Sequence, residues 1–131
     1  MTQNQKPKDF PFKEECLELV EFAFEIHKQL GSGSPALIYR NAFESVLQHN
    51  GLPYTRDKKY AVNYNGMALD HKFHADFLVN DGIIVEIKSC PFMLSSTDLD
   101  VFNQLILSKP AICLIINFNA ELLQFKKVIL V

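Results

Sequence analysis

A nearly unbroken apolar run at residues 111–118 is the feature that most limits how this chain can fold. Its sequence, AICLIINF, lacks the alternation of polar and apolar residues that marks a strand with one face in water. Such a run predicts a central strand that is buried on both faces, as in a sheet covered by helices. The expected class is therefore α/β.

The rest of the chain predicts the element order ααβββαββ. Apolar residues at helical spacing predict a first helix over residues 13–30. A second helix is predicted to have Ser34 as its N-cap and Pro35 in its first position, and to end at Asn50. Further strands are predicted at residues 59–64, 73–79, 83–88 and 122–130, and a third helix at residues 97–108. This order predicts a mixed sheet with helices packed on it.

The length of 131 residues fits one domain, with residues 1–12 as a flexible, polar N-terminal tail and residues 13–131 as the folded part. No run approaches the roughly 18 apolar residues of a membrane helix, and the polar start is not a signal peptide. Cys16, Cys90 and Cys113 lack metal-site spacing and are expected to be reduced core thiols. These features predict a cytoplasmic protein. The net charge of −2 gives no overall attraction to nucleic acid but allows a local basic groove.

Two of the predicted strands carry charged side chains that can meet on one face of a hairpin. Period two places Glu86 and Lys88 on one face of the second strand, and Asp76 and His74 on one face of the first. The length of the loop between them decides whether these faces coincide. A two-residue loop would put the two carboxylates on opposite faces, whereas a three-residue loop pairs Asp76 with Glu86.

The loop sequence Asn80-Asp81-Gly82 favours the three-residue alternative. Asn and Asp suit the central positions of a type I turn, and Gly82 suits the left-handed position that closes such a loop. The Cβ atoms of Asp76 and Glu86 would then lie roughly 5 Å apart, and the carboxylates would repel each other. A divalent cation reverses that repulsion, and Mg²⁺ is commonly held by one or two carboxylates.

The alternative for the same residues is a solvated face with a weak ion pair. Against it, the second strand has β-branched residues on both faces, which indicates that the strand is buried.

The spacing Asp76…Glu86-Ile87-Lys88 resembles that of the PD-(D/E)xK nuclease superfamily. Further blocks at residues 26–39, 74–79, 84–88 and 116–118 are similar to its GxxExxY branch, whose strands carry RADLLV, VVELK and INF. The resemblance covers about residues 14–130 and implies a restriction-endonuclease-like core. It further implies a metal-dependent nuclease in which Asp76 and Glu86 hold Mg²⁺ or Mn²⁺ and Lys88 serves the phosphate. The expected partners are nucleic acid or a second copy of the chain, and no membrane.

Several positions depart from the GxxExxY pattern. The glutamate of the motif falls on Ala36, and His74 replaces a basic residue and is expected to be a polar neighbour of Asp76. Ungapped counting places the family's helix-three His, Gln and Tyr on Thr97, Asp100 and Gln104. Asp100 and Gln104 share a helical face and are expected to support the site. These departures keep a second hypothesis open, in which a degenerate nuclease fold serves as a binding or dimerisation module.

Overall fold

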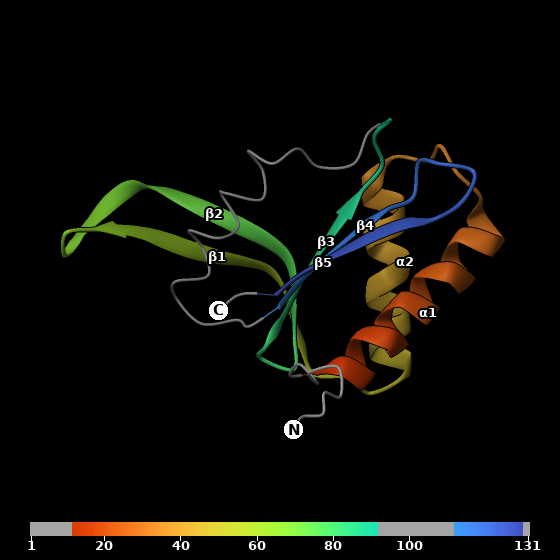
Figure 1. Ribbon diagram of the computed structural model, residues 1–131, viewed down its shortest axis with the longest axis horizontal. Coiled ribbons are helices and arrows are strands. Elements are labelled where there is room, and N and C mark those ends of the chain that lie inside the picture. The colour runs from red at the N-terminus through yellow and green to blue at the C-terminus, as the bar shows by residue number, and fades with distance from the viewer. Residues whose placement is uncertain (1–11, 92–111, 130–131) are drawn as a thin grey trace, which may run out of the picture.

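The computed structural model describes residues 12–91 and 112–129 (Figure 1). Within these ranges the elements are α1 (Lys13–Leu30), α2 (Ala36–His49), β1 (Tyr54–Tyr64), β2 (Met67–Val79), β3 (Ile83–Lys88), β4 (Ile112–Asn117) and β5 (Gln124–Ile129). The strands form one sheet in the order β1-β2-β3-β4-β5, with β3 and β4 parallel and the other pairs antiparallel. The predicted α/β class and mixed sheet are confirmed. The predicted third helix at residues 97–108 lies outside the described residues, as does the tail up to residue 11.

The predicted bounds hold for α1 and β3 and differ for α2, β1 and β2. Pro35, not Ser34, is the N-cap of α2, because its backbone is extended at φ −60° and ψ 150°. The Ser34 N–H donates instead to the hydroxyl of Tyr39 at 3.1 Å. Both strands begin earlier than predicted. The first residues of β1 pair with the end of β2, Tyr54 with Val79, and the first residues of β2 pair with β1 as far as the Asn65-Gly66 turn. Both residues of that turn have positive φ.

Helices α1 and α2 pack on one face of the sheet (Figure 1). The opposite face of the sheet carries a second buried cluster made of Ala75, Leu78, Ile84, Cys113 and Ile115. Every residue of β4 is buried. The prediction of a central strand buried on both faces is therefore confirmed.

Within the described residues none of the three cysteines forms a disulfide, as expected for reduced thiols. Cys16 and Cys113 are buried in the core, whereas Cys90 is only partly buried, so the prediction of a core thiol is wrong for Cys90. In the part of the chain that the structure describes, neither helix is long and apolar enough to cross a membrane.

Strands β1 and β2 continue beyond the sheet as a two-stranded ribbon, drawn at the left of Figure 1. Regular pairing of β2 with β3 extends only from Val79 to Phe77, whereas pairing of β2 with β1 continues to Met67. Asp57 interrupts β1 at the same point along the ribbon. It has a left-handed φ of 55° and lies between Arg56, which pairs with Phe77, and Lys58, which pairs with Ala75. The residue of β2 at this point of divergence is Asp76.

Candidate metal centre

The connection between β2 and β3 has the three-residue length that the sequence predicts. Val79 pairs with Ile83, so Asn80-Asp81-Gly82 forms the loop. Continuing the same register along the two strands brings Asp76 opposite Glu86. We call these two residues the acidic pair.

The backbone of the loop differs from the prediction. Asn80 and Asp81 have left-handed φ values of 53° and 55°, so the prediction of a left-handed Gly82 is wrong. The Gly82 N–H donates to the Val79 carbonyl at 3.1 Å and closes a type I′ turn, whose twist matches that of the strands. Glycine is needed at position 82 for space, because a Cβ atom there would overlap the ring of Phe12.

Where the regular pairing of β2 with β3 ends, the side chains of the acidic pair form hydrogen bonds to the main chain of the opposite strand. Asp76 Oδ2 accepts a hydrogen bond from the Ile87 N–H at 2.8 Å. Glu86 Oε2 accepts one from the Asp76 N–H at 2.9 Å. Each carboxylate is therefore fixed through one oxygen by the main chain. The other two oxygens, Asp76 Oδ1 and Glu86 Oε1, are directed toward basic side chains.

Those basic side chains are Arg40 of α2 and Lys88 of β3. Arg40 Nη1 lies 3.9 Å from Asp76 Oδ1, and Lys88 Nζ lies 3.8 Å from Glu86 Oε1. Both distances exceed those of hydrogen bonds, so the contacts are loose ion pairs. The side chains are 27% and 33% exposed, respectively, so a phosphate group can approach both from solvent. Arg40 was not among the predicted site residues, although it follows Ala36 by one helical turn.

Glu86 is the more deeply buried member of the acidic pair. Its side chain is 6% exposed, compared with 18% for Asp76. Burial raises the pKa of Glu86 from 4.5 to about 8, and the negative charge of Asp76 adds to the rise. The Asp76 N–H and the charges of Lys88 and Arg40 act in the opposite direction. A cation between the carboxylates would stabilise the ionised form and lower this pKa.

Lys88 is held in position by the neighbouring parallel strand. It pairs with Asn117 of β4, and its carbonyl accepts a hydrogen bond from the Phe118 N–H at 2.9 Å. The buried amide of Asn117 donates to the Cys90 carbonyl at 2.9 Å and accepts from the Cys90 N–H at 3.2 Å. Asn117 therefore fixes the chain directly after Lys88. The sequence analysis gave Asn117 no role, although a single polar residue in an apolar run is a usable signal.

The other predicted site residues are not all placed at the acidic pair. His74 is exposed on the ribbon, where it pairs with Lys59. It therefore lies beside the site and does not belong to the hydrogen bonds that hold the carboxylates. Asp100 and Gln104, expected on the third helix, lie outside the described residues.

The acidic pair has the donor chemistry of a site for a hard divalent cation. Mg²⁺ is usually held by one or two carboxylates, and water and substrate phosphate complete its coordination. Within residues 12–91 and 112–129, no group of three or more His, Cys, Asp or Glu side chains is arranged to hold a metal ion. The described residues therefore supply two carboxylate ligands, and the pair fits a metal that keeps several water or phosphate ligands.

The mixed sheet, with two carboxylates and a lysine where an antiparallel pair diverges, defines a nuclease-like α/β domain. The family model of the PD-(D/E)XK nuclease superfamily matches residues 13–128. The chain belongs to the PD-(D/E)XK nuclease superfamily.

The solved structures support the same fold. The crystal structure of SSO0001 is similar, with a TM-score of 0.55 and 18% sequence identity. The match covers 88% of this chain and 63% of that chain, so this protein spans less than two thirds of the length of SSO0001. No curated protein matches the sequence.

Proposed function

We propose that this protein is a divalent-metal-dependent phosphodiesterase that cleaves nucleic acid and belongs to the GxxExxY branch of its superfamily. The observation that supports this most strongly is the geometry of the acidic pair. One oxygen of each carboxylate is fixed by a main-chain N–H, and the other faces a basic side chain. Two carboxyl groups are thereby held in place before any metal or substrate arrives, at a position that phosphate can reach.

The roles of the residues follow from phosphodiester chemistry. Asp76 Oδ1 and Glu86 Oε1 would hold Mg²⁺ or Mn²⁺, which supplies Lewis-acid polarisation of the phosphate and a water of lowered pKa. Lys88 orients the attacking water or stabilises the charge that develops on the phosphate. Arg40 binds phosphate oxygens from the α2 side, where its planar guanidinium provides several donors. Glu86 must be ionised to act as a ligand, so metal binding releases a proton as the pH approaches neutrality.

Metal binding can be tested through stability. A ligand that binds only the folded state raises the melting temperature by mass action. With two protein carboxylates we expect a Kd on the order of 1 mM. A tenfold excess of Mn²⁺ over Kd then adds about 1.4 kcal/mol, or a few degrees in melting temperature.

The variants separate metal binding from catalysis. Asp76→Ala and Glu86→Ala should lose the Mn²⁺-dependent rise, whereas Glu18→Ala, which removes an exposed acid from α1, should keep it. Lys88→Ala should keep the rise and lose cleavage of single- and double-stranded nucleic acid, because Lys88 serves the reaction and not the ion. If wild type shows neither a rise nor cleavage with Mg²⁺ or Mn²⁺, the proposal is wrong.

A second candidate is a binding or dimerisation module without catalysis. One observation favours it: α2 begins with Ala36 where the GxxExxY pattern has glutamate, and its contact with Asp76 comes from the cation Arg40. Arg40 and Lys88 together can neutralise the acidic pair without a metal. A wild-type protein that binds nucleic acid or dimerises, yet neither binds Mn²⁺ nor cleaves, would support this candidate.

A further inference from the structure

Polar side chains lie on one face of the sheet both at the acidic pair and at β5, the outermost strand on that side among the described strands. The register aligns two rows across β3, β4 and β5, one of Glu86, Ile115 and Lys126 and the other of Lys88, Asn117 and Gln124. Directly paired residues of neighbouring strands lie on the same face of a sheet. Ile115 and Asn117 in the middle of these rows are fully buried, whereas Lys88, Gln124 and Lys126 reach the surface, and we call these three residues the polar strip. It lies at the carboxyl ends of the parallel strands β3 and β4, where open α/β sheets bind their ligands.

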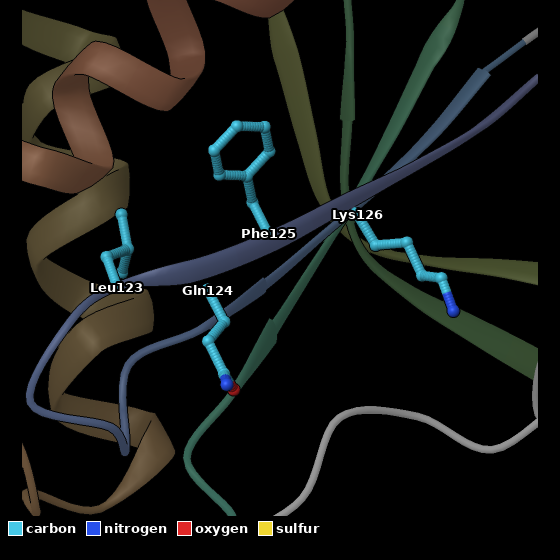
Figure 2. Close-up of a pocket in the computed structure, with 4 residues that line it drawn as sticks. All are labelled: Leu123, Gln124, Phe125 and Lys126. Atoms are coloured by element: carbon cyan, nitrogen blue, oxygen red, sulfur yellow. The ribbon is translucent and has the colours of Figure 1, made fainter.

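Gln124 and Lys126 form the outer end of the polar strip. Figure 2 shows both side chains on one side of β5, with Phe125 on the other side. Both are exposed, and with Leu123 and Phe125 they line an open pocket of about 430 Å³ that includes both sides of the strand. Asn117 Nδ2 donates to Gln124 Oε1 at 3.2 Å, so the amide oxygen of Gln124 is engaged and its NH₂ group remains the donor for a ligand. The outer end thus offers an ammonium and an amide donor, which suit an anion.

A second copy of the chain is a poor occupant of this edge. Antiparallel pairing of two β5 strands would bring Lys126 and Lys127 of one copy close to the same residues of its partner. Like charges directly opposite each other destabilise strand pairing, and lysines on an edge strand discourage it. A polyanion is favoured by the same charges.

We propose that the nucleic-acid backbone continues from the acidic pair over the polar strip, where Lys126 and Gln124 bind a phosphate that is not cleaved. Lys126 lies two strand spacings from Glu86, roughly 10 Å, so one continuous strand can contact both. This inference rests on the proposed function and assigns the direction in which the substrate crosses the sheet. Lys88 stands at the reacting end, and Lys126 stands at the binding end.

The neighbouring lysine provides a matched control. Lys127 pairs with Leu114, which belongs to the core beneath the helices, so it lies on the opposite face of the sheet. Lys126→Ala and Lys127→Ala therefore remove the same charge from adjacent positions of one strand. Only the first change removes a charge from the polar strip.

The test measures binding of short labelled DNA, single- and double-stranded, by fluorescence anisotropy in EDTA, so that cleavage does not interfere. Binding to nucleic acid releases counterions, so the logarithm of the binding constant falls with the logarithm of the salt concentration. The slope is about 0.9 per contacted phosphate for duplex and about 0.7 for single strands. At about 0.1 M salt, one lost contact then weakens binding about eightfold on duplex and about fivefold on single strands. Lys126→Ala should show this loss and a smaller slope, and Gln124→Glu should weaken binding further by placing a carboxylate in the strip. Lys127→Ala should bind more tightly than Lys126→Ala and keep the wild-type slope.

The outcomes separate this inference from the proposed function. If wild type binds but Lys126→Ala and Lys127→Ala weaken binding equally, or neither does, the polar strip is not the path, and the proposed function stands. If wild type binds neither form of DNA, this inference is wrong, whereas the proposed function is decided by the Mn²⁺-dependent rise in melting temperature and by cleavage. The Mn²⁺-dependent rise in melting temperature should be unchanged in Lys126→Ala, which also verifies that the variant is folded.

Discussion

The stability of this protein should fall as the pH rises from about 5 to about 8, and Glu86→Gln should remove most of that fall. Burial, helped by the charge of Asp76, raises the pKa of Glu86 to about 8 in the folded state from an ordinary value of 4.5. Between these two values the folded state binds more protons than the unfolded state, so the free energy of unfolding decreases with pH. The stabilisation is fully present below the unfolded pKa and is lost as the pH rises through the folded one.

The size of the effect follows from the interval between the two values. From 4.5 to about 8 the interval is about 3.5 pH units, and each unit corresponds to about 1.4 kcal/mol. The upper limit is therefore on the order of 5 kcal/mol. The Glu86 side chain is only 6% exposed, so solvent screens little of this effect. In a chain of this size, 1 kcal/mol shifts the melting temperature by about 4 °C, so the upper limit of the fall is about 20 °C.

Thermal unfolding followed by circular dichroism across this pH range provides the measurement. Glu86→Gln keeps an oxygen that can accept the hydrogen bond from the Asp76 N–H but carries no charge, so its pH dependence should be nearly flat. Glu21→Gln removes an equal charge from the exposed surface of α1 and should retain the wild-type pH dependence. Equal pH dependence in wild type and Glu86→Gln would refute the reasoning about the buried acidic pair.

Three further changes test other contacts. Arg40→Ala removes a cation that competes with the metal, so it should raise the pKa of Glu86 further, measured by NMR titration, and lower the Kd for Mn²⁺ about two- to fivefold, measured by calorimetry. An unchanged Kd would contradict this. Asn117→Ala should lower the free energy of unfolding, measured in urea, by about 1–3 kcal/mol, because the Cys90 N–H and carbonyl then lose their hydrogen-bond partner. An unchanged free energy of unfolding would count against this role. Gly82→Ala should cost about 1–3 kcal/mol in the same assay, and much less in a Phe12→Ala background; an equal cost in both backgrounds would show that the contact with the ring is not the cause.

The parts of the fold that the sequence predicted correctly are those with a strong local pattern. α1 has helical spacing along its whole length, and β3 and β4 are apolar enough to indicate strands buried on two faces. The starts of β1 and β2 were placed too late for a physical reason. The start of β2 lies in the ribbon that leaves the sheet, where no buried face imposes an alternating pattern. The start of β1 lies beside the end of β2 within the sheet, and Asp57 interrupts the strand there with a left-handed φ.

The candidate site was predictable where a local rule fixed the geometry. The length of the loop after Val79 decided that Asp76 and Glu86 would meet, and loop length can be inferred from turn-forming residues. The part played by Arg40 depends on how α2 packs against the sheet, which no local pattern records. Likewise, Asn117 matters because the parallel pairing of β3 with β4 places it beside Lys88.

The charges at the acidic pair lead to a last prediction, that metal and nucleic acid bind cooperatively. When both carboxylates are ionised, Arg40 and Lys88 balance them, so a divalent cation leaves an excess of two positive charges. A phosphodiester anion reduces that excess, so each ligand should favour the other by the same factor. Calorimetric titration of Mn²⁺ with and without a non-hydrolysable oligonucleotide should show a lower Kd in its presence, with a smaller difference in Arg40→Ala. Equal Kd values with and without the oligonucleotide would mean that the metal and the phosphate do not share this site.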